Sequence, residues 1–363
     1  MNRLLAAVST AILLVGCNPV PNSDPPDLDI VDYITGLDKP WDVTWTPDGE
    51  MLFTENNTGD VWLAVGGNAV PIHTVSDLDS SGEGGLMGIT LSPNFNADRY
   101  VFLCYTSNAP DIRIVRYEAN LGLSGLSGKT PILTDGPYTT GRHSGCRIKF
   151  GPDGYLWATF GDSATGTAPQ DEESLGGKIL RVDLNGNAAP DNPSGDVWFA
   201  KGYRNPQGIG FRPSDGLACI AQHGPITDDE VECLGSRCFG DVCNSGWNPV
   251  PGYNESVPMT DLNLYPDANE AFWSSGFPTL APSGMTFLDG NQWGSWDNSI
   301  VVAFLKTTQL GYFQLDAFDE LQSLAFSPFP NRLRTAEQGP DGCLYILEDV
   351  SSNGRILKGC VAQ

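Results

Sequence analysis

Short apolar runs separated by polar turns recur along the whole chain. The clearest example spans residues 141–162, GRHSGCRIKFGPDGYLWATFGD, in which two β-rich runs flank Pro152, Asp153 and Gly154. Proline fixes φ at the first turn position and glycine supplies a positive φ, so this pattern predicts a β-hairpin.

Five further segments share this arrangement, at residues 38–55, 82–105, 202–223, 282–306 and 331–349. The six turns lie near residues 47, 93, 152, 213, 296 and 340, an average step of about 59 residues. A single antiparallel unit of this size cannot bury both of its faces, so the repetition indicates a radial array. We therefore predict an all-β fold, a six-bladed β-propeller. A β-sandwich with long loops is the alternative.

The first residues have the pattern of an export signal. Arg3 is followed by an apolar run over residues 4–15 and by small residues before Cys17. This pattern predicts a lipoprotein-type signal peptide at residues 1–17, with Cys17 lipidated and becoming the mature N-terminus. An ordinary signal peptide with a chance cysteine is the alternative. We expect a tether at residues 18–27 and a propeller domain at 28–363, in an exported lipoprotein of the periplasm or cell surface.

Charge narrows the range of partners. The chain has 20 Lys and Arg against 44 Asp and Glu, a formal net charge of −24. Such a surface repels nucleic acid and anionic membranes. We therefore expect no nucleic-acid partner, and contact with a membrane only through the lipid anchor.

Eight cysteines remain when Cys17 is set aside. An even number in an exported chain favours disulfides over free thiols. Hairpin geometry suggests that Cys219 pairs with Cys233 and Cys343 with Cys360. Cys238 and Cys243 are close enough to close a small loop, which leaves Cys104 with Cys146, although the connectivity is formally open.

Polar residues occupy the same phase of the six repeats, eight to ten residues before each turn. These residues are Lys39, Glu83, His143, Arg204 with Asn205, Ser283, and Arg332 with Arg334. A second set ends the following strand: Glu55, Asp162, His223 with Gly224 and Pro225, Lys306, and Asp349. Because antiparallel strands return to the same face, both sets are expected to line one mouth of the central channel.

Cationic residues are concentrated in these phases. Arg142, Arg204, Lys306, Arg332 and Arg334 gather in a strongly acidic chain, which predicts a compact polyanionic ligand gripped by guanidinium groups. Ion pairs between neighbouring blades are the alternative explanation.

His143 is the only histidine at a blade start. Histidine titrates near neutral pH, so His143 is a candidate general base, with a structural role as the alternative.

Residues 224–230, GPITDDE, place free backbone carbonyls beside Asp228, Asp229 and Glu230. Oxygen atoms of this kind bind Ca²⁺. A solvated acidic turn explains the same pattern.

The chain resembles a known family in a series of ordered motifs. These include GLDKPWDVTWTPDG, GEGGLMGITLSPNF, RHSGCRIKFGPDGYLWATFGD, YRNPQGIGF, HGPITDDEVE and NRLRTAEQGPDGCLYILED. They are similar to motifs of the soluble pyrroloquinoline quinone (PQQ)-dependent aldose and glucose dehydrogenases, six-bladed propellers also described as sorbosone dehydrogenase-like. The resemblance covers essentially the whole mature chain.

The resemblance implies roles for individual residues. His143 matches the catalytic base, and Arg204 and Asn205 match a pair that contacts quinone and substrate. The backbone carbonyls of Gly224 and Pro225 match those that hold a cofactor-bound Ca²⁺. The remaining cofactor-binding residues implied are Lys306, Arg332 and Arg334 as the cationic grip on the tricarboxylate quinone, and Asp229 nearby. Glu83 and His223 stand where glucose-oxidising members have glutamine, which leaves the sugar open.

The implied function is PQQ- and Ca²⁺-dependent oxidation of an aldose at C1 to a lactone. Hydride would pass to the quinone, and electrons would leave to a respiratory acceptor. Two other classes remain as alternatives: a cofactor-free propeller that binds a protein or glycan, and a Ca²⁺-dependent lactonase-like hydrolase.

Overall fold

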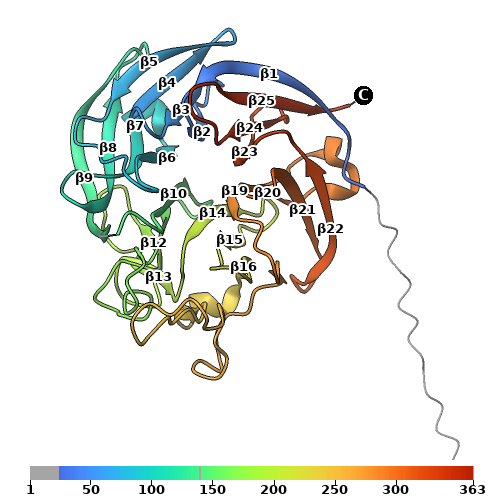
Figure 1. Ribbon diagram of the computed structural model, residues 1–363. Coiled ribbons are helices and arrows are strands. Elements are labelled where there is room, and N and C mark those ends of the chain that lie inside the picture. Colours follow the sequence, from blue (N-terminus) through green and yellow to red (C-terminus); the bar gives the residue numbers. More distant parts are fainter. Residues whose placement is uncertain (1–23, 139, 363) are drawn as a thin grey trace, which may run out of the picture.

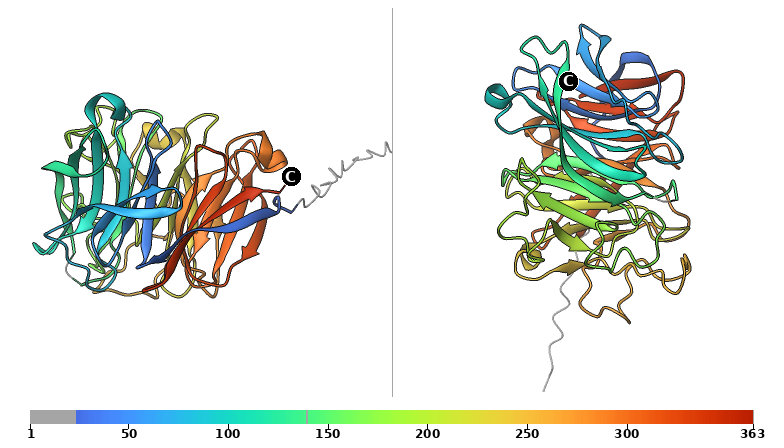
Figure 2. Two further views of the ribbon diagram at one scale, coloured as in Figure 1. Left: turned by 90° about the horizontal axis from the view of Figure 1, so that it is seen from above. Right: turned by 90° about the vertical axis from the view of Figure 1, so that its left-hand side faces the viewer.

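The computed structural model describes residues 24–138 and 140–362, and six small β-sheets form a ring around a common centre (Figure 1). The predicted six-bladed, all-β propeller is confirmed, and the sandwich is excluded. Seen from its rim the ring is a thick disc, with turns and loops on both faces (Figure 2). The expected signal peptide with Cys17, and residues 18–23 of the expected tether, lie outside the described residues.

Each sheet is one blade, numbered here in chain order. Blades 1 to 3 contain β2 (Pro40–Trp45), β3 (Met51–Glu55), β4 (Asp60–Val65) and β5 (Asn68–Thr74); β6 (Leu86–Leu91), β7 (Tyr100–Thr106), β8 (Asp111–Ala119) and β9 (Leu126–Pro137); and β10 (Gly145–Phe150), β11 (Leu156–Phe160), β12 (Lys178–Val182), β13 (Trp198–Lys201) and β17 (Cys243–Asn244). Blades 4 to 6 contain β14 (Pro206–Phe211), β15 (Ala218–Gln222), β16 (Glu230–Leu234) and β18 (Trp273–Ser274); β19 (Pro282–Phe287), β20 (Ile300–Phe304), β21 (Gln309–Leu315) and β22 (Leu321–Pro328); and β23 (Leu333–Gln338), β24 (Leu344–Glu348), β25 (Gly354–Val361) and β1 (Leu28–Leu37). The short helices are α1 (Phe95–Asp98), η1 (Ser236–Phe239) and η2 (Asn291–Trp296).

The first strand of each blade lies nearest the centre, and these inner strands contact one another around the ring (Figure 1). The ring is closed by the N-terminal strand. β1 pairs antiparallel with β25, with Leu28 opposite Val361, and forms the outer edge of blade 6. Joining the two ends of the chain in one sheet links the first blade to the last.

The turns between first and second strands have the predicted geometry. Gly49, Gly154 and Gly342 each have φ between +80° and +88°. Their N–H groups donate to the carbonyls of Thr46, Gly151 and Gly339 at 2.9 Å. A positive φ strains other residues, so glycine in the P-D-G sequence explains the repeated turn.

The core lies between neighbouring blades. One cluster joins Leu52 and Val61 of blade 1 to Leu103 and Val115 of blade 2, and equivalent clusters fill the other blade interfaces. Each such side chain contributes about 1.5–3 kcal/mol through burial. This packing holds the strand ends at the centre in fixed positions.

All four suggested disulfides are present: Cys104–Cys146, Cys219–Cys233, Cys238–Cys243 and Cys343–Cys360. Cys104 lies on β7 and Cys146 on β10, so this bridge ties blade 2 to blade 3 three residues after His143. Among the described residues, no helix is long and apolar enough to cross a membrane.

Candidate active site

Strand starts and strand ends meet at one mouth of the central channel. Pro40 pairs with Glu55, Pro206 with Gln222 and Leu333 with Glu348. Because these strands are antiparallel, the residue before the first and the residue after the second lie at the same end. The convergence predicted from the repeat phases is therefore confirmed for these blades.

A cavity of about 420 Å³ opens at this mouth, and we call it the cationic cavity. Five blades contribute to its lining, with Lys39, Trp41, Asn56, Glu83, Met87, Gln207, His223, Lys306, Arg332, Arg334 and Asp349. The buried guanidinium of Arg147 lies 3.9 Å from the ring centroid of Trp41 and forms an ion pair with Asp42. Arg147 therefore packs against Trp41, one of the residues that line the cavity.

His143 lies two residues before β10, in a left-handed conformation with φ +55°. Its Nδ1 lies 2.7 Å from Oδ1 of Asp162, which follows β11, and both side chains are almost fully buried. Arg142 Nη2 lies 3.3 Å from His143 Nε2. Since arginine only donates hydrogen bonds, Nε2 is the acceptor, and Nδ1 carries the proton donated to Asp162. This tautomer keeps a lone pair on Nε2 for accepting a proton.

Two aromatic residues from a strandless segment hold Asp162 in place. The Tyr253 hydroxyl donates to Asp162 Oδ2 at 2.7 Å and lies 3.0 Å from His143 Nδ1. Trp247, fully buried, donates its indole N–H to the same oxygen at 2.8 Å. Asp162 is thus anchored on one side while it orients the imidazole on the other.

Glu83 and Asn205 support His143 from blades 2 and 4. Glu83 Oε2 accepts from the His143 backbone N–H at 2.8 Å and from Asn205 Nδ2 at 3.2 Å. Asn205 Oδ1 accepts from the Gly145 N–H at 3.2 Å. The two predicted site residues therefore fix the backbone that carries the imidazole.

Arg204 lies between the histidine and the Gly224 turn. Its Nη1 donates to the carbonyls of His223 and Gly224 at 3.1 and 3.0 Å, and its Nη2 donates to Glu255 at 2.5 Å. Burial opposes ionisation of Glu255, but Arg204 and Arg142 together lower the pKa of this carboxyl. Arg204 is almost fully buried.

Lys306, Arg332 and Arg334 line the wall of the cationic cavity. Arg334 Nη2 and Arg332 Nε donate to the two oxygens of Asp349 at 2.9 and 3.0 Å. Burial opposes ionisation of Asp349, but these guanidinium groups prevail and lower its pKa to about 2. Lys306 Nζ donates to Thr279 at 3.1 Å and otherwise faces the cavity mouth.

His223 is neutral at physiological pH. Burial, followed by the charges of Arg204 and Arg334, lowers its pKa to about 3. Its Nε2 is buried and has no hydrogen-bond partner among the described residues, and the same holds for Nε of Arg334. Both atoms belong to side chains that line the cationic cavity.

Two of the three acidic residues after Pro225, Asp229 and Glu230, are buried, whereas Asp228 is half-buried. Asp229 is fully buried, and its carboxylate accepts the N–H groups of Gly224, Leu280 and Ala281 at 2.5–2.9 Å. Glu230 is buried against Gln222 and Thr260, and burial together with Glu232 raises its pKa to about 8. The alternative of a solvated turn is therefore wrong for Asp229 and Glu230, and Asp229 instead fixes the Gly224 N–H.

The repeat phases did not predict Tyr253, Trp247 or Glu255. All three lie in residues 245–272, which contain no strand and follow no blade period. The aromatic residues beside glycine in NSGW and PGY were the available signal. Asp162 was among the residues predicted at the strand ends, but its pairing with His143 is visible only in the folded structure.

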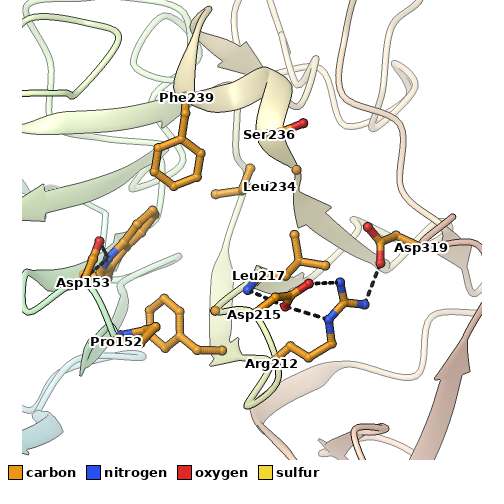
Figure 3. A pocket seen from close by; sticks show the side chains of 13 residues that line it. Pro152, Asp153, Arg212, Asp215, Leu217, Leu234, Ser236, Phe239 and Asp319 are labelled. Atoms are coloured by element: carbon orange, nitrogen blue, oxygen red, sulfur yellow. Dashed lines mark hydrogen bonds and ion pairs between the residues drawn. The ribbon is translucent and has the colours of Figure 1, made fainter. Parts of the chain in front are cut away.

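A larger cavity, about 570 Å³, lies at the turn end of blades 3 and 4, away from His143 (Figure 3). Its charged side chains are paired with one another or with neighbours. Arg212 binds Asp215 and Asp319, and Asp153 binds Arg181. None of the residues that line it also lines the cationic cavity, so we assign it no part in the candidate active site.

Comparison with known proteins gives consistent matches over the whole propeller. A family model described as "Glucose / Sorbosone dehydrogenase" matches residues 37–358. The aldose sugar dehydrogenase YliI of Escherichia coli is 27% identical, over 89% of this chain and 90% of that protein. Quinoprotein glucose dehydrogenase B of Acinetobacter calcoaceticus is 26% identical, over 88% and 85%. The PQQ-bound aldose sugar dehydrogenase of Streptomyces coelicolor has a TM-score of 0.77 and 26% identity, covering 93% of this chain and 99% of that one.

Proposed function

Because the chain belongs to the glucose/sorbosone dehydrogenase family, we propose that it oxidises the C1 hydroxyl of an aldose to a lactone, using PQQ and Ca²⁺. One observation carries this proposal. The proton-accepting nitrogen of an oriented His143–Asp162 pair lies at the same channel mouth as a cavity walled by Lys306, Arg332 and Arg334.

The cavity fits a tricarboxylate quinone. Four cationic side chains, Lys39, Lys306, Arg332 and Arg334, line it together with only two carboxylates, Glu83 and Asp349. A guanidinium can grip a carboxylate of a ligand through parallel hydrogen bonds. Arg334 Nε and His223 Nε2, which have no hydrogen-bond partner in the described part of the chain, are atoms to which a ligand would supply hydrogen bonds. Leaving such atoms unpaired costs about 1–3 kcal/mol each, so a bound polar ligand would relieve this cost.

Calcium would be held by backbone oxygen. Among the described residues, no group of three His, Cys, Asp or Glu side chains is placed to bind a metal. The carbonyls of Gly224 and Pro225, with oxygen atoms of the cofactor, would be the ligands, since Ca²⁺ prefers oxygen and tolerates varied geometry. Asp229 supports this role by fixing the Gly224 N–H at 2.9 Å. When bound, the quinone supplies the hydride acceptor, and Ca²⁺ polarises its carbonyl.

His143 acts as the general base. Nε2 takes the proton of the C1 hydroxyl, and the imidazolium that forms is stabilised by the negative charge of Asp162 at 2.7 Å. Tyr253 and Trp247 hold that carboxylate still, so that little reorganisation accompanies the proton transfer.

Arg204 supplies fixed positive charge beside the reacting atoms. Its guanidinium is buried between the Gly224 carbonyl and Glu255, where electrostatic interactions are weakly screened. It would stabilise the negative charge that a quinone oxygen gains when the cofactor accepts hydride.

The protein would work outside the cytoplasm. The sequence of residues 1–17 supports export and lipidation at Cys17, and a respiratory electron acceptor would then remove the electrons.

A reconstitution assay tests the proposal. Purified quinone-free protein is mixed with an aldose and an artificial electron acceptor, with PQQ, with Ca²⁺, with both or with neither. We expect oxidation and lactone release only with both. Oxidation that does not require PQQ, or absence of PQQ binding in a titration, would contradict the proposed function.

A further inference from the structure

Two guanidinium groups share a single carboxylate oxygen directly beside the base. Glu255 Oε1 accepts from Arg142 Nη2 at 3.0 Å and from Arg204 Nη2 at 2.5 Å. Glu255 belongs to the strandless residues 245–272, and its side chain is 36% exposed. Within this group of three side chains, two positive charges face one negative charge. The carboxylates of Asp162 and Glu83 bind His143 at other atoms, Nδ1 and the backbone N–H.

Arg142 lies where substrate must approach. Its Nη2 is 3.3 Å from His143 Nε2, the atom that accepts the proton, and its side chain is 47% exposed. The walls of the cationic cavity already provide Lys306, Arg332 and Arg334 for the cofactor. Arg142 would reach the sugar by exchanging its present contacts with Glu255 and His143 for contacts with the substrate.

We propose that the preferred substrate is an aldose that carries a carboxylate, a hexuronic acid, and that Arg142 and Arg204 bind this carboxylate in place of Glu255. The inference rests on the proposed function. In the pyranose form of a hexuronic acid, the carboxyl carbon is separated from C1 only by C5 and the ring oxygen. A carboxylate on Arg142 thus leaves the C1 hydroxyl within reach of His143.

The chemical step is that of any aldose. The C1 hydroxyl loses its proton to His143 Nε2, C1 loses hydride to the quinone, and the carbon–oxygen bond becomes the lactone carbonyl. The quinone gains two electrons, and the sugar carboxylate is unchanged. The product is the monolactone of an aldaric acid.

The acidic surface does not forbid an anionic substrate. At physiological ionic strength, charges more than about 8 Å apart are largely screened. The pair of guanidinium groups acts at contact distance, where Arg204 is buried and screening is weak.

Steady-state kinetics test the proposal with three sugars: galacturonate, its uncharged methyl ester, and galactose. We expect kcat/KM for the acid to exceed that for the ester by at least about 10-fold. Arg142→Gln should lower this ratio by about 10- to 100-fold, the range for a lost charged hydrogen bond. Glu255→Ala removes the competing carboxylate, so it should raise the ratio. Arg237→Gln, an exposed arginine on η1, is the matched control and should leave it unchanged.

Binding to quinone-free protein gives a second readout by saturation-transfer NMR. Galacturonate should bind the wild type more tightly than the ester, more weakly in Arg142→Gln, and more tightly in Glu255→Ala. Equal affinities for acid and ester overturn the proposal whether or not the quinone binds. If neutral sugars are oxidised and the acid has no advantage, the dehydrogenase function stands and the acidic substrate is wrong.

Discussion

Substitution of Asp162 perturbs the candidate base, His143, without changing the imidazole itself. Its Oδ1 faces His143 Nδ1 and accepts the Ala164 N–H, both at 2.7 Å. Its Oδ2 accepts from Trp247 at 2.8 Å and from Tyr253 at 2.7 Å. In Asp162→Asn the amide has one acceptor oxygen, so two of these four donors will face an NH₂ group in either orientation.

Both orientations damage catalysis. If the NH₂ group faces His143, Nδ1 must accept, the proton moves to Nε2, and the base loses its lone pair. If it faces Trp247, a fully buried indole N–H loses its acceptor at a cost of about 1–3 kcal/mol. In both cases the charge that stabilises the imidazolium is gone. We expect kcat to fall by about 10²- to 10⁴-fold, equivalent to about 3–5.5 kcal/mol in the barrier.

The assay measures kcat of protein reconstituted with saturating PQQ and Ca²⁺, together with a PQQ titration. Quinone affinity should change little, because Asp162 does not line the cationic cavity. Asp29→Asn makes the same chemical change at an exposed position of β1 and should retain wild-type kcat. If Asp162→Asn keeps kcat within threefold of the wild type, the argument that Asp162 orients the base fails.

Three further predictions follow from other residues. Lys306→Ala should weaken PQQ binding by about 1.5–3 kcal/mol, measured by titration, while saturating PQQ restores part of the rate; unchanged affinity would remove Lys306 from the cofactor grip. Burial raises the pKa of Glu230 to about 8. Its contribution to the free energy of unfolding is therefore fully present below the unfolded pKa of about 4.5, and it is lost as the pH rises toward 8. Denaturant titrations in calcium-free buffer should therefore show that Glu230→Gln gains stability over the wild type between pH 5 and 8, and a constant difference would contradict this. Cys17→Ser should move the expressed protein from the detergent phase to the aqueous phase, and an aqueous wild type would exclude the lipid anchor.

The repeat period in the sequence predicted most of the fold and about half of the candidate active site. His143, Arg204 and Lys306 could be found because each blade starts and ends its inner strands in the same phase, and antiparallel pairing brings those phases together. The pairing of β1 with β25 could not be read in this way, since the partners lie at opposite ends of the chain and no repeat contains both.

Residues outside the period had to be seen in space. Tyr253 and Glu255 reach His143 and Arg204 from a segment without strands, and their sequence separation from His143 exceeds a whole blade. Asp229 shows the opposite difficulty: its place in the acidic segment 224–230 suggested a Ca²⁺ site, while its carboxylate is occupied by three backbone N–H groups. Local pattern cannot tell a carboxylate that faces a ligand from one that fixes a turn.

A single anaerobic turnover separates proton abstraction by His143 from binding of the quinone. Wild type and His143→Gln, each loaded with one equivalent of PQQ and Ca²⁺, are mixed with excess aldose, and the quinone absorbance is followed. The account predicts that both proteins bind the quinone. It also predicts that the wild type reduces one equivalent with release of one equivalent of lactone, and that the variant does so about 10²- to 10⁴-fold more slowly. Equal rates of reduction in the two proteins would contradict the assignment of His143 as the base.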